Sequence, residues 1–155
     1  MIFIRKATKK DVELLFEWAN DSSLRKFSIN TGKIVWNEHV QWFLNKMDSN
    51  SYILIAETEL GIPIGQIRLD KDNDYYLIDF YVANEHRGRG YGKLLLRQGM
   101  DYVVNEIQKV VFKAMVNEKN MPSINSFLSE GFILRGEELL NEQKFFCYYK
   151  EYKLN

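Results

Sequence analysis

Cysteine is almost absent from this sequence of 155 residues, and Cys147 is the only one. A single cysteine excludes an internal disulfide and a zinc site built from several cysteines, and we expect no metal ion. An excess of charge is also missing, since 21 Lys and Arg residues balance 21 Asp and Glu residues. Proteins that bind nucleic acids or membrane surfaces through their overall charge are basic. The composition therefore does not support either kind of partner.

Long apolar segments are lacking as well. No apolar run approaches the roughly 20 residues that a membrane-spanning helix needs, and the apolar part of residues 1–6 is too short for a signal peptide. We therefore expect a cytoplasmic protein. The composition is that of an ordinary globular protein, 46% hydrophobic and 14% aromatic. A chain of this length predicts one domain over residues 1–155, either monomeric or homodimeric.

The spacing of apolar residues predicts an α/β protein with a mixed sheet. Strands are predicted over 2–6, 52–56, 64–69, 75–83, 110–116, 132–135 and 145–152. Helices are predicted over 8–19, 37–47, 93–107 and 121–130, with a short helical segment at 23–27. The resulting order is β-α-α-β-β-β-α-β-α-β-β, with a meander of strands in the middle.

The most informative segment is 87–92, Arg-Gly-Arg-Gly-Tyr-Gly, which joins the strand 75–83 to a helix. Its three glycines have no Cβ atoms, so a ligand can approach the backbone closely. The helix behind them offers unpaired N–H groups and the positive end of its dipole. Two arginines in the segment, and Lys93 after it, add positive charge. This combination predicts a loop that binds a phosphate or pyrophosphate group.

Two common glycine loops do not fit this segment. A Walker-type loop requires Ser or Thr after Gly-Lys, whereas Leu94 follows Gly92-Lys93. A dinucleotide fingerprint requires Gly-x-Gly-x-x-Gly, and the last interval from Gly90 to Gly92 is one residue too short. The strand 110–116, where the ribose-binding acid of that fingerprint would stand, contains no acidic residue.

A third pattern fits. Arg87-x-x-Gly90-x-Gly92 after a strand, followed by Asn120-x-x-Ser123 and Gly131-Phe132, resembles the GNAT family of N-acetyltransferases. The resemblance covers nearly the whole chain. It implies the GNAT fold, a mixed and mostly antiparallel sheet of about seven strands flanked by about four helices. It also implies acetyl-CoA as the cofactor and a small-molecule amine as the acceptor.

The resemblance further implies which residues bind acetyl-CoA. The strand would offer backbone groups to the acetyl and pantetheine parts, the loop would bind the pyrophosphate, and the helix after the fifth strand would contact the pantetheine arm. For Arg89, cofactor contact and a solvated loop charge are both open. The residues so assigned are Phe80, Tyr81, Val82, Arg87, Gly88, Arg89, Gly90, Tyr91, Gly92, Lys93, Asn120 and Ser123.

Catalysis by this family needs a base for the amine and an acid for the CoA thiolate. Many members have Tyr where Phe127 stands and some have Glu where Met115 stands, so both usual groups are missing. Asp79 is one candidate base, since burial in a strand would raise its pKa; a purely structural pair with Arg68 is the alternative. His39 is the other candidate, and a structural histidine is its alternative.

The acceptor is expected to contact the region between Glu17 and Phe43. The polar and aromatic side chains of this region resemble those of a GNAT subgroup of the pseudaminic acid pathway type. That subgroup acetylates amino groups on nucleotide-linked sugars. The residues assigned to the acceptor are Asn20, Arg25, Ser28, His39 and Trp42. Core packing is the alternative for each tryptophan. Two other functions stay open: acetylation of protein N-termini, and a non-catalytic acyl-CoA-binding module.

Overall fold

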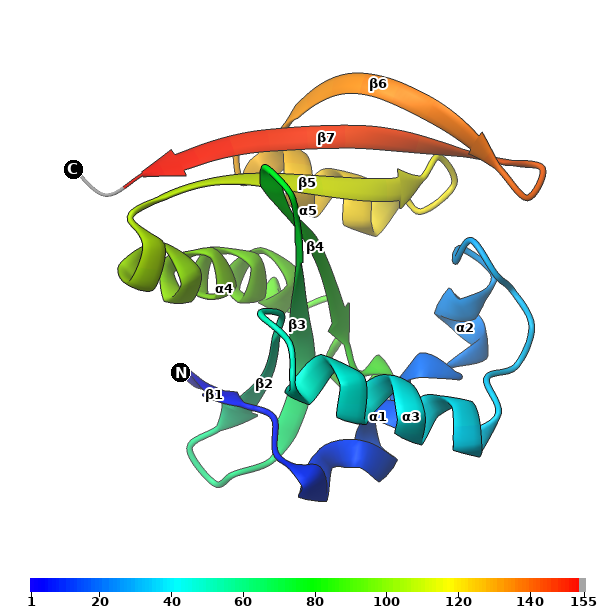
Figure 1. Ribbon diagram of the computed structural model, residues 1–155, viewed down its shortest axis with the longest axis vertical. Coiled ribbons are helices and arrows are strands. Elements are labelled where there is room, and N and C mark those ends of the chain that lie inside the picture. Colours follow the sequence, from blue (N-terminus) through cyan, green and yellow to red (C-terminus); the bar gives the residue numbers. More distant parts are fainter. Residues whose placement is uncertain (154–155) are drawn as a thin grey trace.

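A seven-stranded sheet with helices on both faces organises the described residues 1–153 of the computed structural model (Figure 1). The strands follow the order β1-β2-β3-β4-β5-β7-β6 across the sheet. Neighbouring strands are antiparallel except β4 and β5, which are parallel. The strands are β1 (Ile2–Lys6), β2 (Tyr52–Thr58), β3 (Pro63–Asp72), β4 (Tyr75–Val82), β5 (Lys109–Asn117), β6 (Ile133–Leu140) and β7 (Gln143–Lys153).

The helices are α1 (Val12–Ala19), α2 (Ser22–Arg25), α3 (Trp36–Met47), α4 (Tyr91–Ile107) and α5 (Met121–Ser129). Short 3-10 turns precede α1 and α4. The predicted α/β class, the mixed sheet and the GNAT-type element order are confirmed. The short segment predicted at 23–27 corresponds to α2, which begins one residue earlier and ends two residues earlier. Within residues 1–153, no helix is long and apolar enough to cross a membrane.

Each face of the sheet has its own apolar core. The larger core packs α4 and α5 against one face, around fully buried residues such as Leu95, Ile67 and Phe112. The smaller core packs α1 and α3 against the other face, around Leu15 and Phe43. Strand β2 contributes to both cores, Leu54 and Ala56 to the larger and Ile53 and Ile55 to the smaller, because successive side chains of a strand point to opposite faces.

The sheet divides between β4 and β5. The two strands are in register only where Tyr76 faces Phe112 and Leu77 faces Lys113. Beyond this point β5 stays paired with β7 along its whole length, while β4 stays paired with β3. The two halves of the sheet therefore diverge, with β5, β7 and β6 across the top of the view and β2, β3 and β4 below them (Figure 1).

Candidate functional site

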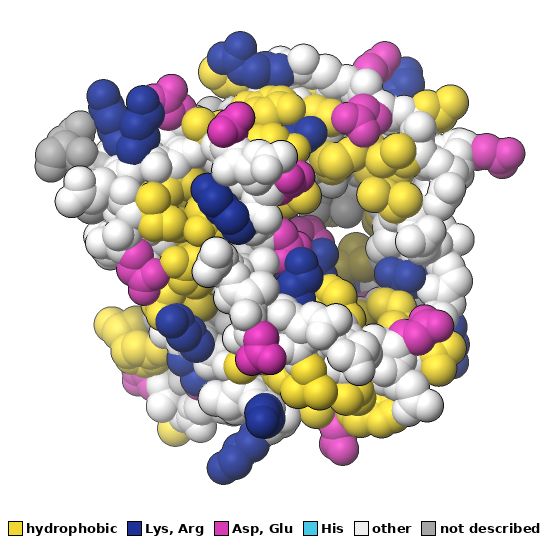
Figure 2. Space-filling view, in the orientation of Figure 1, with side chains coloured by type: hydrophobic (Ala, Val, Ile, Leu, Met, Phe, Trp, Pro, Cys, Tyr) yellow, Lys and Arg dark blue, Asp and Glu magenta, His cyan; other side chains and the backbone are white. Residues whose placement is uncertain are grey.

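A cleft of about 940 Å³ opens where β4 and β5 diverge. Its walls come from the second half of β4, the end of β5, the segment 86–93, the start of α5, and α2 with the loop after it. Figure 2 shows the molecule hollowed at this place, between β5 and β7 above and α1 and α3 below. Segments that are far apart in the sequence therefore meet around one space.

The glycine loop forms one end of this cleft. Gly88 and Gly90 have φ angles of +77° and +81°, and a Cβ built at either position meets no atom within 4 Å. Gly90 lies directly before α4, so the free N–H groups at the helix start face the same open space. A Cβ at Gly92 would lie 3.0 Å from the Phe80 ring and from Ser126 Oγ. The loop is thus open on the cleft side and close-packed against α5 behind it, as an anion site at a helix N-terminus requires.

The start of α5 forms the wall next to the loop. The side-chain oxygen of Asn120 accepts a hydrogen bond from the N–H of Ser123 at 3.4 Å and caps the helix. Asn120 and Ser123 both line the cleft. The structure therefore brings the Asn-x-x-Ser segment to the same space as the glycine loop, although about 30 residues separate them in the chain.

The backbone of β4 exposes polar groups in the cleft. The N–H of Ala83 donates to Ile64 at 2.9 Å, and in an antiparallel pair the direction of hydrogen bonding alternates along the strand. The backbone groups of Phe80 and Val82 therefore face the side where β5 has moved away. The N–H of Phe80 donates to Asp79 Oδ1 at 2.9 Å. The carbonyl of Val82 accepts from Arg87 Nε at 2.8 Å.

Asp79 lies on the wall of the cleft, opposite Arg68 in the β3–β4 pair. Its side chain is 73% exposed, so water in the cleft reaches it, and Arg68 Nη2 lies 3.9 Å from Oδ2. Removal from bulk water by the surrounding walls raises the pKa of Asp79, while the charge of Arg68 and the N–H of Phe80 oppose that shift. A carboxylate that is reachable, loosely paired and shifted toward neutral pH can accept a proton.

Arg68 connects Asp79 to a second carboxylate. Its Nε lies 3.2 Å from Asp70 Oδ2, and Lys46 Nζ lies 2.8 Å from Asp70 Oδ1. The guanidinium also lies over the ring of Trp42, with 5.3 Å from Cζ to the ring centroid. Asp70 lines the cleft and was not predicted from the sequence. The sequence carried a signal for it, because Arg68 and Asp70 are two residues apart on one strand, and side chains at that spacing point to the same face.

Three of the residues assigned to the acceptor do not line the cleft. His39 is buried between α1 and α3, where its Nε2 donates to the carbonyl of Val12 at 2.9 Å, and burial lowers its pKa. Trp42 packs beneath Arg68. Asn20 exchanges two hydrogen bonds with the backbone of Ile34, at 3.0 and 2.8 Å, and holds the loop before α3. The geometry gives these three residues structural roles.

Arg25 and Ser28 do line the cleft. Arg25 donates through Nε to the carbonyl of Gly32 at 2.9 Å, and burial lowers its pKa. It forms no ion pair with a carboxylate among residues 1–153. Its remaining N–H groups are therefore available for an anion in the cleft.

The loop after α2 is held to the turn between β6 and β7. Asn141 donates from Nδ2 to the carbonyl of Ile29 at 2.9 Å, and Gln143 donates to the carbonyl of Ser28 at 3.2 Å. Asn141 also contacts Asn30 Oδ1 at 3.0 Å. These bonds join two segments more than 100 residues apart, and they bound the cleft on the side away from the glycine loop.

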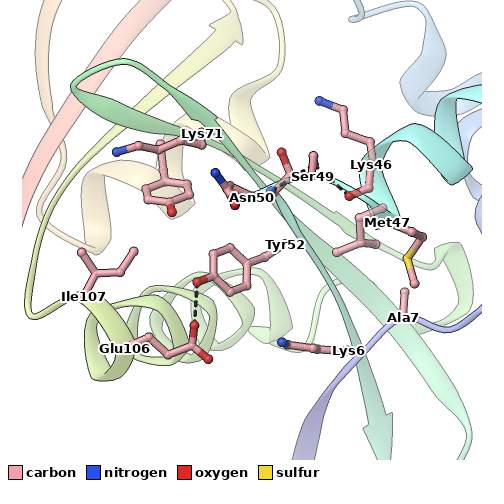
Figure 3. Close-up of a pocket in the computed structure, with 13 residues that line it drawn as sticks. Lys6, Ala7, Lys46, Met47, Ser49, Asn50, Tyr52, Lys71, Glu106 and Ile107 are labelled. Carbon is pink, nitrogen blue, oxygen red and sulfur yellow. Dashed lines mark hydrogen bonds between the residues drawn. The ribbon is translucent and has the colours of Figure 1, made fainter.

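A second pocket of about 450 Å³ lies where β2 begins and α4 ends, and Figure 3 shows its lining side chains. Tyr52 donates to Glu106 at 2.6 Å across it. Its lysines are already engaged: Lys46 with Asp70, Lys71 over the Tyr76 ring and Lys6 over the Tyr52 ring. It has neither a glycine loop nor diverging strands. The larger cleft is therefore the candidate site for chemistry.

The chain is similar to known proteins in both sequence and fold. Residues 12–132 match the model of the acetyltransferase (GNAT) family. An uncharacterized protein of Methanocaldococcus jannaschii is 27% identical over 142 residues, which cover 84% of this chain but only 28% of that protein. The chain thus spans 28% of the length of this curated relative.

Solved structures share the fold across nearly the whole chain. A putative acetyltransferase of Salmonella typhimurium, solved with acetyl-CoA, has a TM-score of 0.80 at 20% identity and covers 97% of this chain and 94% of its own. Spermidine N-acetyltransferase of Vibrio cholerae, solved with CoA and spermine, has a TM-score of 0.82 at 16% identity. The match covers 97% of this chain and 95% of that chain. Ribosomal-protein-alanine N-acetyltransferase of Brucella melitensis has a TM-score of 0.80 at 23% identity. The match covers 96% of this chain and 98% of that chain.

Proposed function

The chain belongs to the acetyltransferase (GNAT) family, and we propose that its cleft takes acetyl-CoA and acetylates a primary amine on a negatively charged acceptor, such as a nucleotide-linked amino sugar. The observation that carries the proposal is the meeting of four features in one cleft. They are an open glycine loop, diverging strands, a carboxylate with a raised pKa and an arginine that has no acidic partner among residues 1–153.

The residues of the cleft fit acetyl-CoA. The open backbone at Gly88 and Gly90, with the start of α4 behind it, would hold the pyrophosphate. The free edge of β4 and the side chains of Asn120 and Ser123 lie on the two sides of the path that the pantetheine arm would follow. Acetyl-CoA supplies the thioester acetyl group; the protein supplies position, hydrogen-bond donors and a proton acceptor.

Asp79 and Phe80 are the groups best placed to act on the reacting atoms. The N–H of Phe80 points into the divergence and can donate to a carbonyl oxygen on which negative charge develops. The carboxylate of Asp79 can take the proton that the amine loses when it becomes a nucleophile. The two roles are linked, because the Phe80 N–H now donates to Asp79 itself. A carbonyl oxygen that takes this N–H leaves Asp79 free to accept a proton.

Arg25 supports an acceptor that carries a negative charge. A guanidinium with unused N–H groups in a cleft wall favours a phosphate or carboxylate, which it can bind through two parallel hydrogen bonds. Ser28 beside it offers a hydroxyl group to a sugar. The support for a nucleotide-linked sugar comes from these two residues, since Asn20, His39 and Trp42 lie outside the cleft.

A cationic amine is the second candidate acceptor. Asp70 and Asp79 line the same cleft, and carboxylates attract the ammonium groups of polyamines or peptide N-termini. Asp70 is already paired with Lys46 and Arg68, so the available negative charge is essentially that of Asp79. For this reason we propose the anionic acceptor ahead of the cationic one.

The test is acetyl transfer to a panel of amines, followed by mass spectrometry and by release of CoA thiol. The panel contains UDP-linked amino sugars, the same amino sugars without the nucleotide, spermidine and peptides with free N-termini. We expect the nucleotide-linked sugars to give the highest kcat/KM, and Arg25→Ala to reduce that value about tenfold or more, the usual effect of losing a charged hydrogen bond. If the protein prefers spermidine or peptides, the proposed anionic acceptor is wrong. If it binds acetyl-CoA but acetylates no amine, it is a non-catalytic module.

A further inference from the structure

The side chain of Arg87 turns away from the glycine loop to which its backbone belongs. Its Nη2 lies 2.8 Å from Asp21 Oδ2, its Nη1 lies 2.9 Å from Ser23 Oγ, and its Nε lies 2.8 Å from the carbonyl of Val82. Asp21 and Ser23 stand at the start of α2. The guanidinium therefore connects the glycine loop, the end of β4 and α2.

Asp21 is the centre of this group of contacts. Its Oδ2 also accepts from Tyr81 Oη at 2.6 Å, and its Oδ1 accepts from the N–H and the hydroxyl of Ser23 at 3.0 and 2.7 Å. The ring of Tyr81 in turn lies 5.4 Å from Arg87 Cζ. Burial opposes the charged form, but hydrogen bonds from Tyr81, Ser23 and Arg87 outweigh it and hold the pKa of Asp21 well below its usual range. Asp21 is thus charged and fully used as an acceptor.

These contacts join the two ends of the cleft. The backbone of Arg87 begins the loop that is open to a phosphate, whereas α2 ends with Arg25 in the wall assigned to the acceptor. Charge-assisted hydrogen bonds with good geometry are short and strong. Such bonds therefore link the loop to α2 through Arg87 and Asp21.

We propose that Asp21 and Arg87 are positioning residues that couple cofactor binding to the order of α2 and the loop 26–34. An anion held by the loop N–H groups fixes the backbone of Arg87, which fixes Asp21 and with it the position of Arg25. The acceptor then binds to a wall that is already ordered. This inference rests on the proposed function, because it requires acetyl-CoA at the glycine loop.

The alternative is that Arg87 leaves Asp21 and binds the pyrophosphate through its guanidinium. In that case cofactor binding would release α2 instead of ordering it. The two possibilities predict opposite changes in the backbone amides of residues 22–34, and they can be separated without an identified acceptor.

The experiment is amide hydrogen exchange of the full chain, with and without saturating acetyl-CoA, in the wild type, Asp21→Asn, Arg87→Gln and Arg87→Lys. In the wild type we expect acetyl-CoA to slow exchange of residues 22–34 about fivefold or more, the lower end of typical coupling between sites. Asp21→Asn and Arg87→Gln should lose this protection while acetyl-CoA still protects residues 88–93, and Arg87→Lys should keep part of it.

Arg135→Gln is the matched control, because Arg135 is exposed on β6, lies outside the cleft, and its side chain has no hydrogen bond or ion pair to another residue of the described chain. At saturating acetyl-CoA it should retain the wild-type protection of 22–34. If Asp21→Asn does not fold, Tyr81→Phe removes one of the bonds to Asp21 and should reduce the protection in part.

Faster exchange of 22–34 on cofactor binding, or protection that survives in both Asp21→Asn and Arg87→Gln, would overturn the coupling and leave the proposed function intact. If calorimetric titration of the wild type with acetyl-CoA detects no binding, the proposed function is overturned, and the coupling with it. Once an acceptor is identified, Arg87→Gln should raise its KM more than it lowers kcat, and the acetyl-CoA dissociation constant should change by less than about threefold.

Discussion

The carboxylate of Asp79 accepts a hydrogen bond from the N–H of the next residue, Phe80, at 2.9 Å, where β4 has lost β5 as a neighbour. The two groups that acetyl transfer needs most, an oxyanion donor and a base, are therefore consecutive in the chain and bonded to each other. Occupation of the Phe80 N–H by another acceptor removes one of the contacts that lower the pKa of Asp79.

Asp79→Asn should lower kcat by about 10²-fold or more, the usual contribution of a general base, with little change in acetyl-CoA affinity. Since the pKa of Asp79 is raised, the carboxylate is protonated and inactive to a higher pH than an ordinary aspartate. We expect kcat/KM to rise with pH through that pKa in the wild type, and this limb to disappear in the variant. Asp72→Asn, in the exposed end of β3, is the control. Wild-type rates in Asp79→Asn would remove Asp79 as the base.

Gly90→Glu should abolish acetyl-CoA binding, since it places a carboxylate where the loop and the start of α4 are open to a phosphate. Gly90→Ala introduces the same strain at φ +81°, roughly 1–2 kcal/mol, without the charge. It should weaken binding far less. Calorimetric titration of the two folded variants measures the difference. Equal affinity for Gly90→Glu and wild type would refute the loop assignment.

His39→Gln should destabilise the protein by about 1–3 kcal/mol, because it disturbs a buried hydrogen bond to Val12 and the packing of α1 on α3. It should leave kcat per folded molecule nearly unchanged, since His39 lies outside the cleft. Chemical denaturation and steady-state rates on the same preparation separate the two effects. A large fall in kcat with normal stability would show that His39 contributes to catalysis.

The same residue predicts a pH dependence of stability. Burial lowers the pKa of His39 in the folded state, whereas the unfolded chain binds a proton near pH 6.5. Below about pH 6.5 the unfolded state therefore binds more protons, and stability is lost as pH falls. His39→Gln should show a smaller loss of unfolding free energy between about pH 6.5 and 5 than the wild type. An unchanged slope would mean that His39 does not titrate differently in the two states.

Phe127→Tyr should fold and should raise turnover where protonation of the thiolate limits the rate. Phe127 lines the cleft although it is buried. Its ring packs edge-on against the rings of Phe80 and Phe132, with 5.5 and 5.0 Å between ring centroids. A hydroxyl added at the ring edge can reach the cleft and act as an acid. Comparison of kcat and of the unfolding free energy checks both parts. A large loss of activity would show that the ring position tolerates no added atom.

The fold was readable from the sequence because its signals are local. Apolar runs marked the strands, and the alternating glycines marked the turn into α4. The strand predicted over 132–135 was too short, because β6 continues to Leu140 on the exposed edge. Its later residues have no buried face to produce an apolar alternation, and pairing with β7 holds them in the sheet.

The side chains of the acceptor region were harder to place. The sequence shows that His39 and Trp42 lie three residues apart on a helix, but not which side of that helix faces the cleft. The packing of α3 on α1 decides this, and it turns His39 toward Val12. Arg87 was assigned to the cofactor because its backbone belongs to the loop. Its contact with Asp21, 66 residues earlier in the chain, has no local signal.

The most direct test of the whole account is a crystal structure of the protein with bound acetyl-CoA. We predict the pyrophosphate within hydrogen-bond distance of the N–H groups of residues 88–93, the thioester carbonyl on the N–H of Phe80, and Arg87 still paired with Asp21. A cofactor bound elsewhere, or a Phe80 N–H that still donates to Asp79 in the complex, would contradict it.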